Sequence, residues 1–275
     1  MKSLPPPSLI KRSVYGLRRV INMTYILLST KVSSVLIFSA NGFSFYEKSI
    51  SALIAKVVFK KRVVVSLRGG EMEKELKENH ITRLLFKILM RHIDFMVCQS
   101  STWREVFKVH VLNEDRNKLV TRMNWLAVPT DNSRLNAEGD NLVVSYLGWL
   151  TAAKGMSDLL FLIEKLEEKN NSDFVFQIMG EGEFYSVFEE RINRLKSVKI
   201  VLTGWVNEKE KTKYLRKSDI IILPSRFEGM PNALIEGMAY GNIPIAYNVG
   251  AISDLISKDR GFLLPHGDKW GLYNS

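Results

Sequence analysis

Cysteine and long apolar runs are almost absent from this sequence of 275 residues. Its single cysteine, Cys98, excludes an intramolecular disulfide and favours a reducing, cytoplasmic setting. Cys98 ends the apolar run Phe95-Met-Val-Cys98, which predicts a buried structural thiol and not a nucleophile. No run of 18 or more apolar residues occurs, so the sequence predicts no helix that spans a membrane.

Motifs that would hold a metal ion or an activated nucleophile are missing as well. The sequence has no H-E-x-x-H, no cysteine and histidine cluster with zinc spacing, and no Asp-x-Asp pair. It also has no G-x-S-x-G elbow and no Walker A loop. The four histidines are scattered along the chain, and we assign a role to none of them: His80, His92, His110 and His266. We therefore expect chemistry that needs neither a metal ion nor a bound cofactor.

Acidic residues are missing from the first 46 positions, which carry six basic residues. Residues 1–135 hold 23 Lys and Arg against 10 Asp and Glu, a net charge of +13, whereas residues 136–275 hold 16 against 19, or −3. A basic half beside a nearly neutral half predicts that the first half faces an anionic partner. No zinc-finger, RRM or basic-zipper pattern occurs, so we favour an anionic membrane surface over nucleic acid.

The basic segment near the N-terminus has the spacing of an amphipathic helix. Its apolar residues recur at steps of three and four: Ile10, Val14, Leu17, Ile21, Tyr25 and Leu28. Its basic side chains fall on other faces: Lys11, Arg12, Arg18 and Arg19. Two interpretations remain open, a helix that lies on an anionic membrane or an internal helix whose polar face is solvated. An organellar transit peptide has a similar composition, but this pattern runs directly into a strand.

Short apolar strands and helices alternate along the rest of the chain. The first set has predicted strands over 34–40, 62–67, 94–98 and 118–122, with helices over 45–59, 71–92 and 101–109. The second set has predicted strands over 142–147, 174–179, 198–202, 219–223, 243–247 and 262–264, with helices that begin near Lys154, Glu183, Asn207 and Pro231. This alternation predicts an α/β protein with two Rossmann-like, doubly wound domains and parallel sheets.

The predicted boundaries follow from the gap between the two sets. Residues 1–125 form the first domain, which opens on a turn-like lead-in over 1–7, and residues 142–275 form the second. The polar stretch 126–141, which has no periodicity, is the linker. Ligands of such sheets bind at the carboxyl ends of the strands, so the loops after each strand are the places to look for function.

One such loop lies in the stretch Leu223 to Gly241, between a buried strand and a helix that begins near Pro231. Proline at the first helical position needs no acceptor, and the free amides of residues 232–234 then favour an anion. Glu228 lies in the loop before this helix, and Glu236 can lean back toward the same volume. An anion site between two hydroxyl-accepting carboxylates suits a nucleotide sugar.

This stretch closely resembles the E-x7-E motif of retaining glycosyltransferases of the GT-B fold, family 4 in particular, with Glu228 and Glu236 as the two glutamates. The resemblance implies that Glu228 holds hydroxyl groups of the donor sugar and that Glu236 holds the ribose. Each carboxylate alone has a simpler interpretation, since Glu228 would complement a helix dipole and Glu236 would be a solvated helix residue. The whole pattern, placed after a buried strand, favours the nucleotide-sugar interpretation.

Other loops of the second half resemble segments of the same enzymes. Gly148 to Gly155 is similar to their G-R-L-x-x-x-K-G segment, in which Lys154 matches and Trp149 replaces the arginine. The similarity implies that the arginine and the lysine grip the donor diphosphate. Three shorter segments match as well: Gly180-Glu-Gly182 beside the nucleotide, Gly204-Trp205-Val206 near the base, and Asn248-Val249-Gly250 before a later helix. Tyr185 replaces the third glycine of a dinucleotide fingerprint, which excludes that alternative.

The first half resembles these enzymes less closely. Arg68, in Arg68-Gly69-Gly70, follows a predicted strand where relatives place a histidine of the catalytic site. No opening strand with a glycine-rich acceptor loop precedes the basic helix, and four strands are too few for a whole domain of this type. The chain also stops at Ser275, before the terminal helices of relatives. We therefore expect an incomplete first domain in a GT-B protein that is shortened at both ends.

The resemblance implies a metal-independent, retaining glycosyltransferase. It would move a sugar from a nucleoside-diphosphate sugar to a hydroxyl of a glycan or lipid-linked glycan, in the synthesis of cell-surface polysaccharide or lipopolysaccharide. Catalytic roles fall to Glu228, Lys154 and Arg68. Donor contacts fall to Gly148, Trp149, Gly180, Gly182, Trp205, Gly229, Met230, Pro231, Asn232, Ala233, Leu234 and Glu236.

We expect this protein in the cytoplasm, with a peripheral contact on the inner face of the plasma membrane and no nucleic-acid partner. The alternative function is a non-catalytic nucleotide-sugar-binding partner, a degenerate or truncated GT-B protein. Trp149, Arg68 and the missing ends support this alternative. A GT-B epimerase or phosphorylase is less favoured, because no lysine site for pyridoxal phosphate is evident in the sequence.

Overall fold

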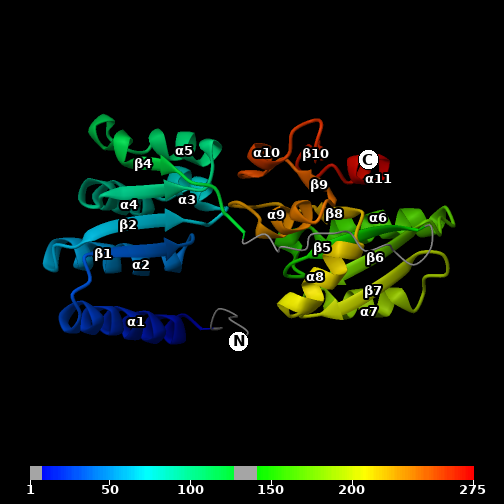
Figure 1. Cartoon of the computed structure of the whole chain (residues 1–275), viewed down its shortest axis with the longest axis horizontal. Helices are drawn as coiled ribbons and strands as arrows, with labels where there is room; N and C mark the ends of the chain where they lie inside the picture. Colours follow the sequence, from blue (N-terminus) through cyan, green and yellow to red (C-terminus); the bar gives the residue numbers. More distant parts are fainter. Residues whose placement is uncertain (1–7, 127–140) are drawn as a thin grey trace. The chain divides into compact units, whose positions relative to one another are not determined.

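The computed structural model describes residues 8–126 and 141–275 and divides the chain into two compact units, Met1–Met123 and Asn124–Ser275 (Figure 1). Each unit has a parallel sheet of its own with helices packed on it. The predicted fold class, two Rossmann-like α/β domains with parallel sheets, is confirmed. The predicted lead-in over 1–7 and all but the end residues of the predicted linker over 126–141 lie outside the described residues.

The first unit has a four-stranded sheet in the order β1-β2-β3-β4. Its strands are β1 (Ser34–Ser39), β2 (Arg62–Leu67), β3 (Phe95–Cys98) and β4 (Leu119–Thr121). Its helices are α1 (Leu9–Ser29), α2 (Phe43–Leu53), α3 (Met72–Glu78), α4 (His80–His92) and α5 (Ser101–Lys108), with the π-helical η1 (Ile54–Val58) after α2 and the 3₁₀ helix η2 (Asn113–Lys118) before β4. Helices that cover a parallel sheet bury its central strands on both faces, which explains why three consecutive valines, residues 63–65, form the middle of β2.

Cys98 lies at the end of β3 and is buried, as predicted. Burial raises the pKa of the Cys98 thiol to about 12, although the positive charge of Arg104 acts in the opposite direction. A thiol with a raised pKa is scarcely ionised near neutral pH and is a poor nucleophile. We therefore assign Cys98 a structural role.

The single helix predicted over residues 71–92 is wrong, because α3 and α4 are separate helices that meet at Asn79. Asn79 has extended backbone angles, φ −109° and ψ 111°, and its side chain accepts hydrogen bonds from the amides of Ile81 and Thr82. An asparagine in this position caps a new helix and competes with continuation of the old one. The apolar periodicity continues on both sides of the cap, so the pattern alone hides the break.

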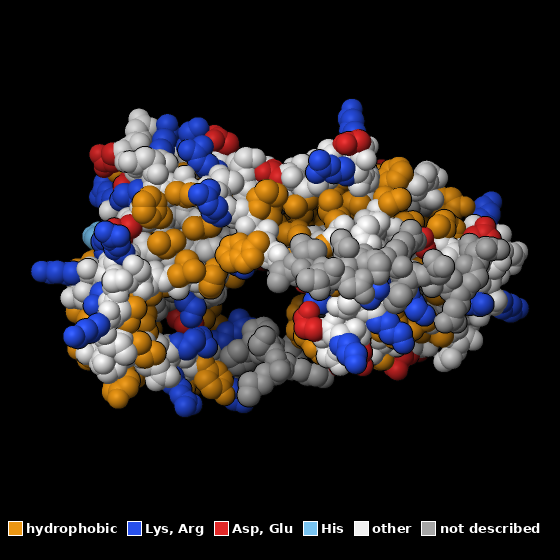
Figure 2. Space-filling view, viewed as in Figure 1, with side chains coloured by type: hydrophobic (Ala, Val, Ile, Leu, Met, Phe, Trp, Pro, Cys, Tyr) orange, Lys and Arg blue, Asp and Glu red, His pale blue; other side chains and the backbone are white. Residues whose placement is uncertain are grey.

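The basic N-terminal segment forms α1, but its predicted apolar residues do not face the core. We call these six residues, from Ile10 to Leu28, the α1 stripe; their exposed fractions lie between 57% and 78%. The buried residues of α1 are Gly16 and Leu27, on another face. The interpretation of α1 as an internal helix with a buried apolar face is therefore wrong for this structure. Figure 2 shows hydrophobic and basic side chains together over the surface formed by α1.

One basic residue of α1 is committed to the fold. Arg19 donates from Nε and Nη2 to the Glu47 carboxylate of α2, at 2.7 Å and 2.5 Å. The Glu47 side chain is 6% exposed, and the hydrogen bond from Arg19 is the largest cause of its lowered pKa. Lys11 and Arg18 are exposed and make no ion pair with another described residue. None of the helices within residues 8–126 and 141–275 is both long and apolar enough to cross a bilayer.

The second unit has a six-stranded sheet in the order β10-β9-β8-β5-β6-β7. Its strands are β5 (Leu142–Leu147), β6 (Phe174–Met179), β7 (Lys199–Gly204), β8 (Ile220–Leu223), β9 (Ile243–Tyr247) and β10 (Phe262–Leu264). Its helices are the 3₁₀ helix η3 (Ala152–Lys154), then α6 (Met156–Glu168), α7 (Tyr185–Ile192), α8 (Glu208–Lys217), α9 (Asn232–Ala239), α10 (Ile252–Leu255) and α11 (Lys269–Asn274). The strands predicted over 142–147, 174–179, 243–247 and 262–264 are confirmed in full.

Helix starts in the second unit follow local capping chemistry. Asn207 caps α8 in a reciprocal capping box with Glu210, as the predicted start near Asn207 requires. The α-helix predicted to begin near Lys154 begins instead at Met156, because a 3₁₀ turn and the left-handed Gly155 (φ 75°) intervene.

The order of the strands in the second sheet shows where a ligand site is expected. The chain runs from β5 outward to β7 and returns to β8 on the other side of β5, so the direction of winding reverses between β5 and β8.

Candidate functional site

The site lies at the carboxyl ends of β5 and β8, where an open parallel sheet that reverses its winding leaves a crevice. The loop over 148–155 follows β5, and the loop over 224–231 follows β8. The two loops are tied together, since the Arg226 amide donates to the Ala153 carbonyl oxygen at 2.9 Å. Residues that the sequence placed in separate motifs are thereby brought to one edge of one sheet.

The helix after β8 begins one residue later than predicted. Pro231 is the N-cap of α9, with extended angles of φ −74° and ψ 114°, and Asn232 is the first helical residue. The prediction that proline takes the first helical position is therefore wrong by one residue. The amides of residues 232–234 make no hydrogen bond to another described residue. Their free N–H groups and the helix dipole still favour an anion at this end.

Lys154 and Glu228 form an ion pair between the two loops. The distance from Lys154 Nζ to Glu228 Oε1 is 2.6 Å, and the exposed fractions of the side chains are 29% and 9%. A carboxylate this deeply buried needs a partner charge. Because an ammonium group has three donors, Nζ can keep this contact and still bind an anion.

Two glycines allow the close backbone contacts around this pair. A Cβ on Gly250, which has φ +58°, would lie 1.9 Å from the carbonyl oxygen of Glu228. A Cβ on Gly180 would lie 1.8 Å from the carbonyl oxygen of Gly148. No other residue fits at either position without moving the backbone. The glycines thus fix the Glu228 loop and the spacing of the loops after β5 and β6.

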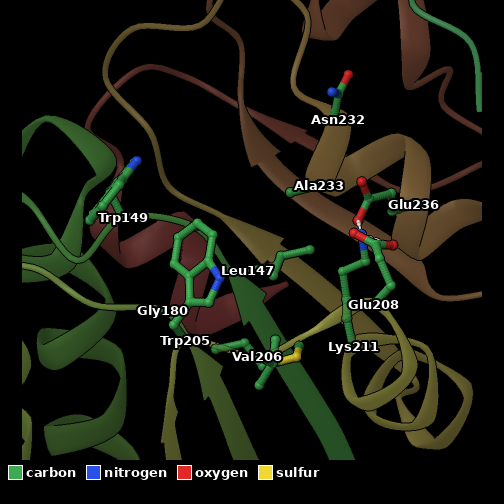
Figure 3. Close-up of a pocket in the computed structure, with 12 residues that line it drawn as sticks. Leu147, Trp149, Gly180, Trp205, Val206, Glu208, Lys211, Asn232, Ala233 and Glu236 are labelled. Atoms are coloured by element: carbon green, nitrogen blue, oxygen red, sulfur yellow. Dashed lines mark hydrogen bonds and ion pairs between the residues drawn. The ribbon is translucent and has the colours of Figure 1, made fainter. Parts of the chain in front are cut away.

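A pocket of about 470 Å³ opens beside the start of α9 (Figure 3). This volume is typical of small-molecule sites. Residues predicted to bind the donor line it: Gly148, Trp149, Gly180, Trp205, Asn232, Ala233 and Glu236. Val206, from the segment Gly204-Trp205-Val206, lines it too, and four residues that the sequence did not single out complete it: Leu147, Met179, Glu208 and Lys211.

Glu236 is held by a lysine that sequence reasoning missed. The Lys211 Nζ lies 2.8 Å from Glu236 Oε2 and 2.9 Å from Glu208 Oε2, between the two carboxylates seen in Figure 3. Lys211 and Glu236 are 15% and 17% exposed, whereas Glu208 is 89% exposed. Burial lowers the pKa of Lys211, but the hydrogen bonds to Glu236 and Glu208 outweigh burial and raise it overall. The cation therefore stays charged and keeps the Glu236 carboxylate at the pocket wall.

Two tryptophans form another part of the pocket wall. The rings of Trp149 and Trp205 have centroids 5.5 Å apart and planes inclined at 44°. A hydrogen bond from the end of β5 fixes the backbone at Trp149, since the Tyr146 hydroxyl donates to the Trp149 carbonyl oxygen at 2.8 Å. Burial, with the Glu228 carboxylate nearby, raises the pKa of Tyr146, so this hydroxyl remains a donor.

The other predicted donor residues shape the loops without lining this pocket. Gly182 lines a neighbouring hollow together with Trp205. Met230 and Leu234 are buried, at 5% and 0% exposed. The Gly229 carbonyl oxygen accepts a hydrogen bond from the Ala251 amide at 2.9 Å, and Pro231 caps α9.

Arg68, the third predicted catalytic residue, belongs to the first unit. It directly follows β2, and its amide donates to the Ser39 carbonyl oxygen at 2.7 Å. Its guanidinium lies over the Phe38 ring, 4.3 Å from the centroid. This cation–π contact gives Arg68 a structural partner in the absence of any ligand.

Some of the missed residues carried a signal in the sequence and some did not. Leu147 and Met179 are the last residues of β5 and β6, so the rule that ligands bind at strand ends points to them. Lys211 has no such mark, because α8 also carries the exposed lysines Lys209 and Lys213. Within the described residues, no group of three or more His, Cys, Asp or Glu side chains is placed to hold a metal ion. The expected independence of metal stays a prediction.

Known proteins resemble this chain in sequence and in fold. An uncharacterized glycosyltransferase of Methanocaldococcus jannaschii, MJ1178, is 25% identical over 181 residues, which are 66% of this chain and 48% of that protein. The UDP-Gal:alpha-D-GlcNAc-diphosphoundecaprenol alpha-1,3-galactosyltransferase of Escherichia coli is 26% identical over 210 residues, which are 74% of this chain and 48% of that enzyme. This chain thus spans about half the length of these relatives.

Among solved structures, Anabaena Alr3699/HepE in complex with UDP and glucose superposes with a TM-score of 0.68 at 14% identity. The superposition covers 98% of this chain and 73% of that one, and it shows a shared fold. Residues 128–272, more than half of the chain, match the family described as glycosyl transferases group 1. This chain therefore belongs to the glycosyl transferases group 1 family.

Proposed function

We propose that this protein is a retaining glycosyltransferase that moves a sugar from a nucleoside-diphosphate sugar to a hydroxyl of a glycan or lipid-linked glycan. The observation that carries the proposal is the joining of three features at the carboxyl ends of β5 and β8. These are the free amides at the start of α9, the Lys154–Glu228 ion pair, and a pocket whose wall holds Glu236. An anion site with a carboxylate on each side matches a diphosphate that links a ribose to a sugar.

The names of similar proteins support this donor and acceptor. The similar Escherichia coli enzyme is named for transfer from UDP-Gal to a diphosphoundecaprenol-linked sugar, and the Anabaena structure holds UDP and glucose. Both proteins are longer than the present chain. A lipid-linked or glycan acceptor for this chain is part of the proposal, as is a role in cell-surface polysaccharide synthesis.

Each group at the site has a separate task in the proposed reaction. The α9 amides and Lys154 bind the diphosphate, Glu228 accepts hydrogen bonds from hydroxyl groups of the sugar, and Glu236 accepts them from the ribose. The bond between the anomeric carbon and the phosphate oxygen breaks, and the acceptor oxygen bonds to the same face of that carbon. The leaving phosphate takes the acceptor's proton, so the anomeric configuration is retained without a protein nucleophile.

The charge that develops on the departing diphosphate is the main demand on the protein. Preorganised donors stabilise such charge, and the loss of one costs about 10²–10³ in turnover in comparable sites. Lys154 and the amides of residues 232–234 supply such donors here. They do so without a metal ion in this proposal, so we expect turnover to persist in EDTA.

A non-catalytic nucleotide-sugar-binding partner is the second candidate function. The observation that favours it is Trp149, which lies at the wall of the pocket, at the position where the family resemblance implies a phosphate-binding arginine. Such a protein would bind a nucleotide sugar and show no turnover. The experiment below therefore measures binding and turnover separately.

We also propose that the first unit contacts an anionic membrane through α1. The α1 stripe is exposed along the whole helix, and the basic side chains of Lys11 and Arg18 are exposed beside it. A helix with an exposed apolar face and basic neighbours suits the boundary between lipid headgroups and acyl chains. A protein held there would act on lipid-linked acceptors from the cytoplasmic side.

Substitution of the two glutamates tests the donor site. Calorimetry would measure the binding of UDP and of UDP-galactose, and release of UDP in the presence of detergent-solubilised bacterial lipids would measure turnover. We expect Glu236→Gln to weaken UDP and UDP-galactose alike, by about 1–3 kcal/mol, because both ligands carry the ribose. Glu228→Gln should keep the binding of UDP and lose turnover, because UDP lacks the sugar. Glu190→Gln, at an exposed position of α7, is the matched control.

The outcomes separate the alternatives. Equal loss of UDP affinity in both variants, or no loss in either, contradicts this placement of the donor. Tight binding of UDP-galactose by the native chain without turnover on any acceptor supports the non-catalytic partner. The experiment should be repeated with ADP- and GDP-sugars, since the base is not part of this proposal.

A further inference from the structure

The start of α9 has no capping side chain of its own. Its N-cap is Pro231, and no described side chain accepts a hydrogen bond from the first amides of the helix. An ordinary cap, such as Asn207 of α8, would take up one of these amides. The proline therefore leaves the amides of residues 232–234 available to a ligand, but it also leaves the first turn of a short helix without the side chain that usually fixes it.

A residue from a distant part of the chain, Asn124, fixes this end of α9 without using its amides. Asn124 is the first residue of the second unit and lies 108 positions before Asn232. Its Nδ2 donates to the carbonyl oxygen of Met230 at 3.0 Å and to Oδ1 of Asn232 at 2.7 Å. Its backbone N–H donates to the sulfur of Met230 at 3.2 Å. All of these acceptors are carbonyl or side-chain atoms, so the helix start is held while its N–H groups stay available.

The same contacts decide how the side-chain amide of Asn232 is turned. Because its Oδ1 accepts from Asn124, its Nδ2 lies on the other side of the amide and carries two donors. This Nδ2 has no hydrogen-bond partner among the described residues, and Asn232 is exposed at the wall of the pocket. In Figure 3 the amide points away from the Glu236 carboxylate, which the proposed function assigns to the ribose. The part of the donor that follows the ribose, its diphosphate, is therefore the part that would reach Asn232.

We propose that Asn124 is a positioning residue for the donor diphosphate, which turns the Asn232 side chain so that its Nδ2 donates to a phosphate oxygen. This inference rests on the proposed function, because it assumes that the pocket binds a nucleoside diphosphate. A donor that is aimed before the ligand arrives needs no reorganisation when charge develops on the diphosphate. Asn124 thereby adds one side-chain donor to the free amides of α9 and leaves all of those amides to the ligand.

Calorimetry of the full chain with UDP and with uridine tests this role. Asn232→Ala should weaken UDP by about 10-fold, because it removes a hydrogen bond to a charged group. Asn124→Leu keeps a similar volume and loses the donors, so it should weaken UDP by about 5-fold as the Asn232 amide becomes free to rotate. Uridine has no phosphate and should bind equally to the native chain and to both variants. Asn193→Leu, at an exposed position at the end of α7, is the matched control and should bind UDP as the native chain does.

A double variant shows whether the two asparagines act together. Asn124→Leu with Asn232→Ala should bind UDP about as weakly as Asn232→Ala alone, since Asn124 then has no amide to turn. Native UDP affinity in Asn124→Leu would overturn the proposal, and so would single losses that multiply in the double variant. Equal weakening of UDP and uridine in Asn124→Leu would also overturn it, because Asn124 would then serve only the fold. A native chain that binds neither ligand would overturn the proposed function, and this inference with it.

Discussion

The two units of this protein expose apolar side chains in different ways. In the second unit, an exposed aromatic ring such as Trp205 lies at a pocket where strands end and where backbone amides are free. In the first unit, the α1 stripe is a row of six exposed apolar residues along one face of a helix, from Ile10 to Leu28. A concave site with a few polar groups is typical of a small ligand, whereas a long convex stripe is typical of an extended surface.

The two units also differ in net charge and in whether their charged side chains are paired. Residues 136–275 have a net charge of −3. The two cations of the candidate site, Lys154 in the loop after β5 and Lys211 at the pocket wall, are each paired with a carboxylate. Residues 1–135 have a net charge of +13, and basic residues such as Lys11 and Arg18 are exposed. Paired charges fix the geometry of a site, while unpaired surface charges attract a distant partner of opposite sign. The two units therefore suggest two kinds of partner, a soluble nucleotide sugar and a charged surface.

The largest expected effect comes from breaking the ion pair in the second unit. Lys154→Met should leave the Glu228 carboxylate without its cation at 9% exposure, which should lower the free energy of unfolding by about 1–3 kcal/mol. The same change removes a donor to the diphosphate, so turnover should fall by about 10²–10³. Chemical denaturation and a transfer assay would measure the two effects. Lys213→Met, at an exposed position of α8, is the control.

The double variant separates structure from catalysis at this pair. Lys154→Met with Glu228→Gln leaves no buried charge unpaired, so most of the stability should return. Turnover should stay low, because neither the phosphate cation nor the sugar acceptor is restored. Recovery of turnover together with stability would mean that the pair serves the fold alone.

A smaller effect is expected from the basic residues of α1. Lys11→Gln with Arg18→Gln should weaken binding to vesicles with anionic lipid by about 30-fold, since each basic residue near such a surface contributes about 1 kcal/mol. The residual binding should fall further in Leu17→Ser with Ile21→Ser, which removes part of the α1 stripe. Co-sedimentation at several salt concentrations would measure this, because the electrostatic part weakens as salt screens it.

Arg19→Gln provides the matched control for this prediction. Arg19 is paired with Glu47 inside the unit, so its loss should lower stability and change vesicle binding much less. UDP affinity should be unchanged in all these variants, since the donor site lies wholly in the second unit. Equal binding to neutral and anionic vesicles would contradict a membrane role for the charge of the first unit.

Sequence reasoning succeeded where one local signal decides the outcome. The apolar run of β9 predicted its bounds, and Asn207 predicted the start of α8. The glutamate motif predicted that Glu236 lies near a helix start at a strand end, where the structure has a pocket. Such features depend on neighbouring residues in the chain, so the chain alone reveals them.

Sequence reasoning failed where two local signals compete, or where only the folded structure distinguishes residues of the same type. At Asn79 a helix cap competes with an unbroken apolar period, and the cap prevails. In α1 the apolar period left two interpretations open, because it did not show that the small Gly16 marks the face that packs on α2. Among the four lysines of α8, the fold alone selects Lys211 for the pocket wall, because its partner Glu236 comes from a distant part of the chain.

The smallest expected effect concerns Lys211, which sharpens the contrast between paired and unpaired cations. Lys211→Met should weaken UDP by about 1 kcal/mol, roughly 5-fold, since Glu236 loses the cation that holds it at the pocket wall. The same variant tests how the stability contributed by Lys211 depends on pH. The pKa of Lys211 is raised in the folded chain. The stabilisation from its ion pairs is therefore fully present below the unfolded pKa of about 10.4 and is lost as pH rises through the higher folded value. The stability gap between the native chain and Lys211→Met should be constant from pH 7 to 9 and should shrink above about pH 10. Lys209→Met, at an exposed position of the same helix, should show no such gap at any pH. Denaturation curves for the three proteins would measure it, and a gap that persists unchanged to pH 12 would show that Lys211 acts through packing and not through its charge.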